Sequence, residues 1–441
     1  MSSKEKVSVV SCETALTFLL TLKFLSIVPV IICLKRITEG VVILLSLKFH
    51  KDPERIGGGI TEINYDGHRL IIDMGAELEF EGEEPNPNID GVTIGKANCD
   101  GVLITHYHGD HMALVKYVLP EVPVYMSKVS KEIGLAIQNR LKLSKKCLSD
   151  EETIKVLERT NILKYEDFGK DIQIGAFIVR PIRVDHSAFD ALAYLITVAG
   201  KKIFFTGDFR SHGYTGKALF KTLEYYVGKV DVIITEGTML SRDEELISEI
   251  DFKNKDEEIC DEPKYVLFLC SSTNVDSLMS MASVAKSTLK MFCVDSFQRE
   301  ILEVISNNSK SDFYKQTLHK IRYPQGLIVA LRISQLDFAK QFYKKYGQDS
   351  ILLYSMWDGY IEKIEELKQL KELWGNRFLQ LHSGGHASAD DIKKLVEICS
   401  KGREQTMVIP MHLENFQDVN DLCLPATICN LRQSEELVLV P

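Results

Sequence analysis

Positive charge is in short supply along this 441-residue chain, whose 53 Lys and Arg residues are outnumbered by 62 Asp and Glu residues. The formal net charge is −9 at pH 7. This balance disfavours a broad basic surface of the kind that coats nucleic acid, although it is compatible with a local basic groove. Bound metal ions would contribute positive charge that the count leaves out.

Paired cysteines are missing as well. The ten cysteines are scattered, with no CxxC pair and no dense spacing, which disfavours a disulfide framework and favours reduced thiols in a cytoplasmic protein. Neither an internal repeat nor a low-complexity tract is visible. Hydrophobic residues make up 45% of the chain and charged residues 26%, as in ordinary soluble proteins. The length predicts two closely packed domains.

A long apolar run lies near the N-terminus. Residues Ala15–Leu34 are almost wholly apolar and about long enough to span a bilayer. No convincing signal-peptide cleavage site follows, and the flanking basic residues do not set an orientation. We therefore assign residues 1–40 as an apolar extension. Membrane association through residues 15–34 and a packed apolar segment are the alternatives.

The densest cluster of metal-ligating side chains follows the apolar run Gly101–Ile104. His106, His108, Asp110 and His111 fall within six positions directly after this expected strand. Strand alternation sends the first two histidines to the same side, and a turn can bring the other two ligands beside them. Imidazole and carboxylate groups suit Zn²⁺. The motif therefore predicts a metal site at the end of a strand.

Other histidine and acidic residues also stand where expected strands end, which is typical of a site assembled from strand-end loops. Helical periodicity is visible over Met112–Leu119 and Ser130–Leu143. The strands and the side chains that end them are Arg69–Ile72 with Asp73, Phe177–Arg180 followed by His186, Lys202–Thr206 with Asp208, Val232–Ile234 followed by Glu236, and Val408–Met411 with His412.

The composition of the sequence changes at Asp251–Lys264. This acidic, hydrophilic stretch predicts a boundary loop. Beyond it, strands and helices alternate from Tyr265 to about Tyr360, which predicts a parallel sheet with covering helices. The histidine-bearing pattern resumes at Phe378. We therefore expect one domain in two parts, residues 41–245 and 378–441, with an α/β domain inserted at residues 246–377.

Taken together, these strand-end residues resemble the metallo-β-lactamase fold, an αββα sandwich with a two-metal site at one edge. The run from Leu381 to Ser388, LHSGGHAS, resembles the second motif of the β-CASP nucleases and especially the HxSGHA run of the ribonuclease J group. Glu236 matches the acidic first motif, and His412 in its Pro-x-His setting matches the third. The resemblance implies an α/β protein, with the insertion forming a β-CASP cap domain.

The resemblance also implies a residue set for two Zn²⁺ ions, with Mn²⁺ as the alternative metal. One ion would be held by His106, His108 and His186, and the other by Asp110, His111 and His412, with Asp208 bridging both. The remaining implied roles are Asp110 orienting the attacking water, His386 as general acid held by Glu236, Asp73 orienting a ligating histidine, and His382 with Ser383 binding a phosphate.

The function that follows is hydrolysis of phosphodiester bonds in RNA, with single-stranded DNA as a second candidate substrate. One alternative keeps the chemistry and changes the substrate to a small ester, lactone or thioester, which the acidic composition favours. Another is a non-enzymatic subunit of an RNA-processing complex. Endonuclease or exonuclease action and a homodimer or monomer stay open. The run Ser355–Tyr360, SMWDGY, acquires no role from the resemblance.

Overall fold

The computed structural model describes residues 44–78, 84–143, 150–242, 246–315 and 325–439. The apolar run at residues 15–34, for which a membrane anchor is one alternative, lies outside these ranges. Among the helices that are described, none combines the length and the apolar character needed to cross a bilayer.

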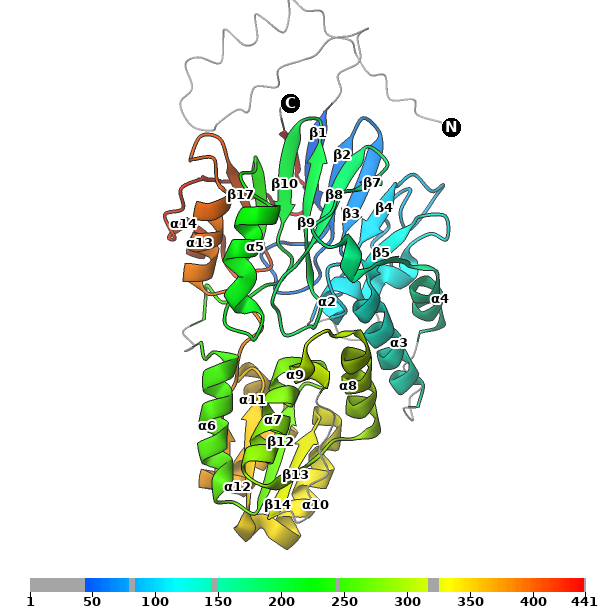
Figure 1. The fold of residues 1–441 in the computed structure, drawn as a ribbon. Coiled ribbons are helices and arrows are strands. Elements are labelled where there is room, and N and C mark those ends of the chain that lie inside the picture. Colours follow the sequence, from blue (N-terminus) through cyan, green and yellow to red (C-terminus); the bar gives the residue numbers. More distant parts are fainter. Residues whose placement is uncertain (1–43, 79–83, 144–149, 243–245, 316–324, 440–441) are drawn as a thin grey trace, which may run out of the picture.

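Two seven-stranded sheets form the larger part of the molecule (Figure 1). The order of strands in the first sheet is β19 (Glu436–Leu439), β1 (Leu45–Phe49), β2 (Thr61–Tyr65), β3 (His68–Ile72), β4 (Gly101–Leu103), β5 (Val124–Ser127) and β6 (Asn161–Leu163). The order in the second sheet is β18 (Thr427–Ile428), β17 (Met407–Met411), β11 (Val232–Glu236), β10 (Lys201–Phe205), β9 (Leu192–Val198), β8 (Phe177–Arg183) and β7 (Ile172–Ile174).

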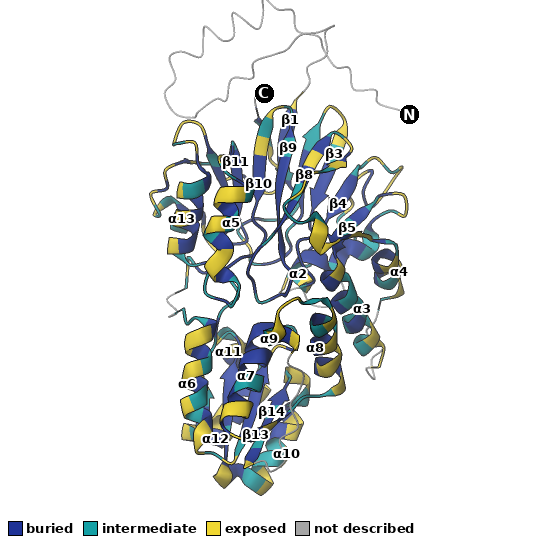
Figure 2. Ribbon diagram, viewed as in Figure 1, coloured by how far each residue is buried: buried dark blue, intermediate teal, exposed yellow. Residues whose placement is uncertain are grey.

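The two sheets pack face to face because alternate apolar residues of each strand point to one side. Leu47 and Ile63 of the first sheet belong to the same buried cluster as Tyr194, Ile196 and Ile234 of the second. Figure 2 shows buried residues along the strands and exposed residues on the outer sides of the covering helices. The core of the sandwich therefore lies between the sheets.

Helices cover the outer face of each sheet. α3 (Lys128–Lys142) and α4 (Glu151–Arg159) pack on the first sheet, and α5 (Leu219–Tyr226) and α13 (Ala389–Cys399) pack on the second. This arrangement confirms the predicted αββα sandwich. Two short helices, α2 (Gly109–Met112) and α14 (Phe416–Asn420), follow strand ends.

The chain segment between β11 and β17 builds a separate parallel sheet, which confirms the predicted α/β insertion (Figure 1). Its strand order is β13 (Lys290–Cys293), β14 (Gly326–Leu331), β12 (Tyr265–Cys270), β15 (Ser350–Ser355) and β16 (Phe378–Gln380). The sheet thus includes β16, whose three residues directly follow the predicted insertion at residues 246–377. We refer to this part of the molecule as the cap.

The cap helices lie on both faces of this sheet, as the alternation of strands and helices predicts. One face carries α6 (Glu249–Asp261), α7 (Val275–Ser287) and α8 (Ser296–Asn308), and the other carries α10 (Leu336–Tyr346) and α12 (Glu365–Trp374). The short helices α9 (Asp312–Lys315) and α11 (Gly359–Lys363) complete the cap.

The predicted boundary loop at Asp251–Lys264 is wrong, because most of this stretch forms helix α6. Ser248 caps the helix by accepting a hydrogen bond from the amide of Asp251. Acidic residues in the first turn stabilise the helix by interacting with the positive end of its dipole. Phe252, Asp256 and Cys260 recur at four-residue intervals and are buried. The many charged residues around these buried positions made the helical pattern hard to recognise in the sequence.

The expected helix at Met112–Leu119 is shorter and tighter than predicted. Helix α2 ends at Met112, and a 3-10 helix over Ala113–Tyr117 replaces the rest. The amide of Leu114 bonds to the carbonyl of Met74, so a regular helical hydrogen bond is lost to the neighbouring strand end. This contact holds the histidine motif against β3.

Proline at an exposed position of α6 tests its helical assignment. Lys255 is exposed in the middle of the helix, so Lys255→Pro should lower the free energy of unfolding by about 3 kcal/mol, because it removes a backbone hydrogen bond and clashes with the preceding turn. Lys255→Ala is the matched control and should be nearly neutral. Urea unfolding followed by circular dichroism measures both, and equal stabilities would contradict the helix.

Candidate metal centre

Strand ends from both sheets converge at the edge of the sandwich that faces the cap (Figure 1). Asp73 follows β3, and the motif from His106 to His111 follows β4 and includes α2. His186 lies between β8 and β9, Asp208 follows β10, and His412 follows β17. Residues far apart in the chain thus meet at one edge because their strands are neighbours in two packed sheets.

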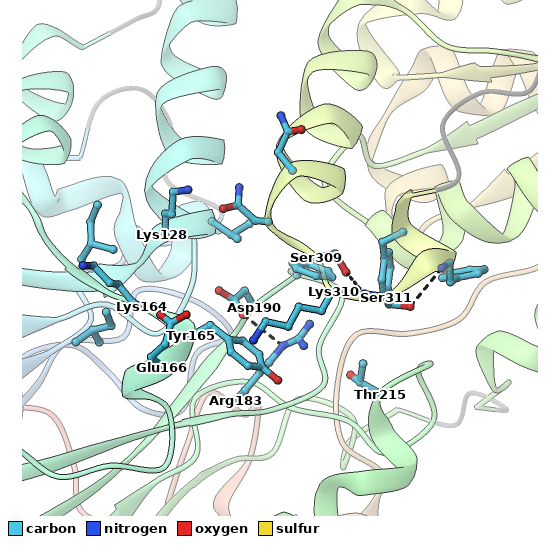
Figure 3. A pocket seen from close by; sticks show the side chains of 18 of the residues that line it. Lys128, Lys164, Tyr165, Glu166, Arg183, Asp190, Thr215, Ser309, Lys310 and Ser311 are labelled. Atoms are coloured by element: carbon cyan, nitrogen blue, oxygen red, sulfur yellow. Dashed lines mark hydrogen bonds and ion pairs between the residues drawn. The ribbon is translucent and has the colours of Figure 1, made fainter.

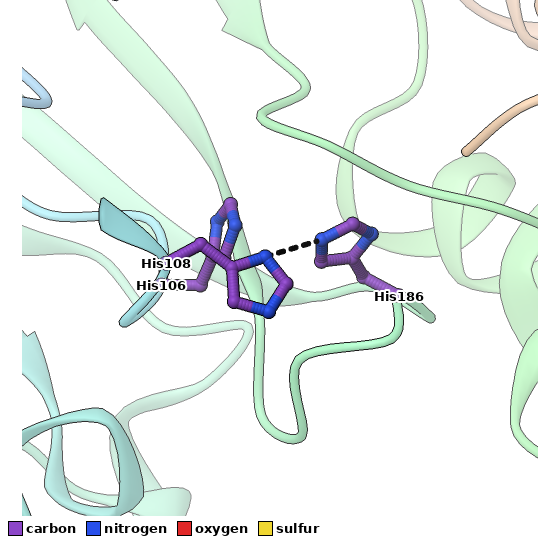
Figure 4. Close-up of side chains that lie close together, drawn as sticks. All are labelled: His106, His108 and His186. Carbon is purple, nitrogen blue, oxygen red and sulfur yellow. Dashed lines mark hydrogen bonds between the residues drawn. The ribbon is translucent and has the colours of Figure 1, made fainter. Parts of the chain in front are cut away.

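His106, His108 and His186 form the first cluster of potential ligands, with ligand atoms within 4.8 Å of one another (Figure 4). His108 Nδ1 lies 3.3 Å from His186 Nε2. Burial lowers the pKa of His108 to about 4 and holds the pKa values of His106 and His186 well below the usual range. The three imidazoles are therefore neutral at pH 7, as metal ligands must be.

Contacts at the Nδ1 atoms orient two imidazoles of the first cluster. His186 Nδ1 donates to the carbonyl of Gly385 at 2.5 Å, and His106 Nδ1 lies 3.0 Å from Thr105 Oγ1. His106 Nε2 is buried without a hydrogen-bond partner in the described structure. A buried polar atom without a partner is unfavourable, and a cation would satisfy it. The cluster therefore fits a metal ion.

The second cluster contains Asp110, His111, Asp208 and His412, also with ligand atoms within 4.8 Å of one another. Asp208 Oδ2 lies 3.1 Å from His111 Nε2, and 3.9 and 3.8 Å from the Nε2 atoms of His106 and His186. This carboxylate faces both clusters, and its Oδ1 is buried without a partner among the described residues. Nitrogen and carboxylate donors in this arrangement suit divalent cations.

Neighbouring side chains fix the rings of the second cluster. Asp73 Oδ2 accepts a hydrogen bond from His111 Nδ1 at 2.8 Å, and Thr105 donates to the same carboxylate through its amide and hydroxyl. Thr238 Oγ1 lies 2.8 Å from His412 Nδ1. Such contacts orient ligating histidines and select their tautomer. The two threonines were not predicted, because a threonine near a strand end carries no distinctive sequence signal.

Two of these residues adopt a backbone conformation that L-residues rarely use. Asp73 has a φ of 63° and His412 a φ of 54°. Left-handed backbone at non-glycine residues costs free energy and persists where surrounding contacts enforce it. Here both residues turn sharply off a strand end, which directs their side chains towards the clusters.

His386 lies on the cleft side of the second cluster, paired with a buried carboxylate. Its Nδ1 donates to Glu236 Oε2 at 2.8 Å and lies 3.7 Å from Asp208 Oδ2. Burial alone would lower the pKa of His386, but the carboxylates of Glu236 and Asp208 outweigh it and raise the pKa to about 9. Glu236 is also held by the amide of Phe209 at 2.8 Å. The two carboxylates thus favour the protonated form of this imidazole beside the candidate metal ligands.

The two predicted phosphate-binding residues have different surroundings. His382 lines the cleft, with its Nδ1 3.5 Å from Ser355 Oγ. Ser383 is fully buried, and its hydroxyl donates to the carbonyl of Ile247 at 3.0 Å. The predicted phosphate contact of Ser383 is therefore not compatible with this geometry, because its one hydroxyl proton is used inside the protein.

Arg210 is a buried cation that sequence reasoning missed, and it joins the sandwich to the cap. Its guanidinium contacts three carboxylates, at 3.5 Å from Asp185, 3.3 Å from Glu249 of α6 and 2.7 Å from Asp276 of α7. It also donates to the carbonyl of Gly384 at 2.8 Å. Burial raises the pKa of Asp185 to about 6 and that of Glu249 to about 7. Arg210 therefore connects the loop before His186, two cap helices and the LHSGGHAS run.

A cleft of about 890 Å³ opens above the metal ligands, between the sandwich and the cap. His108, Asp110, His382 and His386 line it together with cap residues. A second cavity of about 920 Å³ lies elsewhere between sandwich and cap and contains none of the predicted site residues (Figure 3). The cleft rather than this second cavity is therefore the candidate substrate site.

Gly75 tests how closely the motif must pack against β3. A Cβ atom there would collide with the backbone carbonyl of Asp110, whereas a Cβ at Gly59 meets no atom within 4 Å. Gly75→Ala should displace Asp110 and weaken Zn²⁺ binding by about 10- to 100-fold, measured by competition with a chelating dye. Gly59→Ala is the control and should bind as the wild type does. Unchanged affinity in Gly75→Ala would contradict the packing described.

Removal of the Arg210 cation should destabilise the protein strongly. Arg210→Met leaves three buried carboxylates uncompensated, so the free energy of unfolding should fall by about 3–5 kcal/mol. Arg432→Met, at an exposed position, is the control and should change it by less than about 0.5 kcal/mol. Urea unfolding of both variants gives the comparison, and a loss below about 1 kcal/mol in Arg210→Met would exclude this role.

Comparison with known proteins agrees with the geometry. Residues 60–245 match the model of the metallo-beta-lactamase superfamily. A crystal structure of a protein of unknown function from Enterococcus faecalis V583 superimposes with a TM-score of 0.71 over 90% of this chain and 100% of that one, at 18% identity, which shows a common fold.

Curated relatives match less than half of the chain. It is 26% identical over 193 residues to "Endoribonuclease ysh-1" of Neurospora crassa and 25% identical over 194 residues to "Cleavage and polyadenylation specificity factor subunit 3" of Dictyostelium discoideum. Each match covers 42% of this chain but only 22% and 24% of those proteins, respectively. The similarity to the ribonuclease J group stays a prediction. The predicted resemblance is supported by the match of residues 60–245 to the metallo-beta-lactamase superfamily model, and the cap is inserted into the sandwich where the resemblance places a β-CASP domain.

Proposed function

We propose that this protein is a metal-dependent ribonuclease that hydrolyses phosphodiester bonds of RNA. The observation that carries the proposal is the pair formed by His386 and Glu236, in which a carboxylate holds the His386 ring 3.7 Å from Asp208 at the cleft. Phosphodiester hydrolysis needs an acid at this place, because the leaving sugar oxygen must take up a proton. The named activity of the curated relatives, endoribonuclease, supports the same reaction.

The proposed ligand set follows the two clusters. His106, His108 and His186 would hold one Zn²⁺ ion, and Asp110, His111 and His412 a second, with Asp208 shared between them. Two such ions would activate a water molecule and neutralise the charge that develops on the attacked phosphate. Asp73 and Thr238 keep the nitrogens of His111 and His412 directed at the site.

Three side chains of the protein would orient the water, bind the phosphate and protonate the leaving oxygen. Asp110 accepts a hydrogen bond from the attacking water and so orients it. His382, whose pKa burial lowers to about 4, is neutral at pH 7 and donates an N–H to a phosphate oxygen. His386 Nε2 delivers its proton to the leaving oxygen, while Glu236 stabilises the charged imidazole until that transfer. The product would carry a 5′-phosphate.

A time course on single-stranded RNA labelled at the 5′ or the 3′ end tests the proposal. Cleavage that depends on added Zn²⁺ or Mn²⁺ and stops with a chelator is expected, and the fragment sizes distinguish internal from terminal cutting. Parallel assays with a chromogenic ester and a lactone test the small-substrate alternative. Hydrolysis of those compounds without RNA cleavage would overturn the assignment of RNA as substrate.

Metal content tests the ligand set directly. The purified protein should contain two zinc ions per chain, and Asp208→Ala should lose most of both, because this carboxylate faces both clusters. His68→Ala, at a side chain that is 48% exposed, is the control and should keep the full content. Elemental analysis after gel filtration measures the stoichiometry, and full metal content in Asp208→Ala would exclude a shared ligand.

The acid role of His386 predicts a dependence on the leaving group. His386→Ala should slow RNA cleavage by about 10²- to 10⁴-fold. The same variant should hydrolyse bis(p-nitrophenyl) phosphate at close to the wild-type rate, because nitrophenolate leaves without a proton. Steady-state kinetics on both substrates gives the comparison. Equal losses on the two substrates would show that His386 acts on the metal site rather than as an acid.

A further inference from the structure

The run SMWDGY, left without a role by the sequence, forms one wall of the cleft. Trp357, Tyr360 and Lys363 lie after β15 and in α11, and they line the same cleft as His108 and Asp110. Arg242, which follows β11 on the sandwich side, also lines it. Two cations and two aromatic rings from different parts of the chain therefore meet beside the metal ligands.

The indole of Trp357 is the centre of this group. The Arg242 guanidinium carbon lies 4.7 Å and Lys363 Nζ 5.1 Å from the ring centre, both within cation–π distance. The ring of Tyr360 meets the indole edge-on at 5.3 Å. The four side chains thus contact one another through the indole.

Neighbouring residues determine the position of the Trp357 indole. Gly359 permits it, because a Cβ atom at this residue would collide with the six-membered ring of Trp357. The carbonyl of Trp357 accepts hydrogen bonds from the hydroxyl of Tyr354 at 2.8 Å and from the amide of Tyr360 at 3.1 Å. Ring and backbone are therefore fixed before any ligand binds.

Arg242 is half-buried and differs from Arg210, the fully buried arginine at this domain interface. Arg210 is surrounded by three carboxylates, whereas the Arg242 guanidinium lies against an aromatic face. Arg242 Nε is buried and, like Arg210 Nε, has no hydrogen-bond partner in the described part of the chain. A guanidinium stacked on a ring keeps its N–H groups available for a phosphate. The burial of an unpaired donor is unfavourable unless an acceptor arrives.

We propose that Arg242, Trp357, Tyr360 and Lys363 form a subsite for an unpaired nucleotide next to the scissile bond. The two cations bind its phosphate, and the aromatic pair stacks its base, the combination by which single-stranded nucleic acid is bound without a sequence requirement. The subsite selects single strands, because a paired base is not free to stack. This inference rests on the proposed ribonuclease function and specifies its substrate.

Tryptophan fluorescence offers a direct test, because the chain has only two tryptophans and the other, Trp374, is buried in the cap. The full chain carrying His386→Ala, loaded with Zn²⁺, is titrated with a single-stranded oligoribonucleotide that it cleaves too slowly to consume. The emission of Trp357 should be quenched on binding. A duplex of the same sequence should quench it at least ten-fold less effectively at equal concentration.

Variants separate the two contributions. Arg242→Met should weaken RNA binding and reduce the slope of log affinity against log salt by about 0.7, the value for one phosphate contact on a single strand. Trp357→Leu should weaken binding by about 5- to 150-fold. Gly359→Ala displaces the indole without removing a functional group and should give a similar loss. Lys394→Met removes a cation that lies 4.1 Å over the Phe220 ring on the sandwich and is the matched control.

The outcomes distinguish failure of the subsite from failure of the function. Absence of quenching, or equal quenching by duplex, while the wild-type protein cleaves RNA and bis(p-nitrophenyl) phosphate would overturn the subsite and leave the ribonuclease standing. Absence of quenching together with no hydrolysis of either substrate would overturn both. Thermal unfolding of each variant is measured alongside, and Gly359→Ala and Arg242→Met keep the test valid if Trp357→Leu does not fold.

Discussion

The buried carboxylate of Asp208 is the contact on which the rest of the site depends. It faces imidazoles of both clusters and lies 3.7 Å from the ring of His386. Burial alone would raise its pKa, but the neighbouring histidines, His111 foremost, hold the pKa well below the usual range. A buried anion among inward-facing nitrogens is stable only when cations or donated protons surround it. The histidines stay close to Asp208 because the packed sheets and the strand-end turns place them there. Hydrogen bonds with Asp73, Thr105 and Thr238 then fix the rings.

A second buried charge network sets the position of the cap. Arg210 is connected to Asp185 beside the ligand His186, to two cap helices, and to the loop that carries His386. Because a fully desolvated guanidinium requires every one of these partners, the loop and the cap are held in one geometry. The acid–carboxylate pair and the candidate metal ligands therefore keep their spacing, even though they come from distant segments of the chain.

The cleft between the sandwich and the cap combines two kinds of chemistry. Its floor contains the metal ligands and His386, and its wall contains aromatic rings with cations placed against them. The overall negative charge of the chain disfavours a broad nucleic-acid surface, and the local wall explains how a strand could still be bound. An acidic protein needs only a few well-placed cations at the point of reaction, since metal ions supply further positive charge there.

The sequence by itself determined the fold class and which strand ends carry the clustered histidine and aspartate residues, because the apolar strand segments and the motif from His106 to His111 are local patterns. It failed at α6, whose buried stripe is hidden among charged residues, and at Ser383, whose hydroxyl turns inward. Only the tertiary structure decided the partners of Arg210, Thr238 and Trp357. The contacts of Arg210 with the cap, of Thr238 with His412 and of Arg242 with Trp357 join residues far apart in the chain, and no spacing along a sequence encodes which distant side chains will face each other.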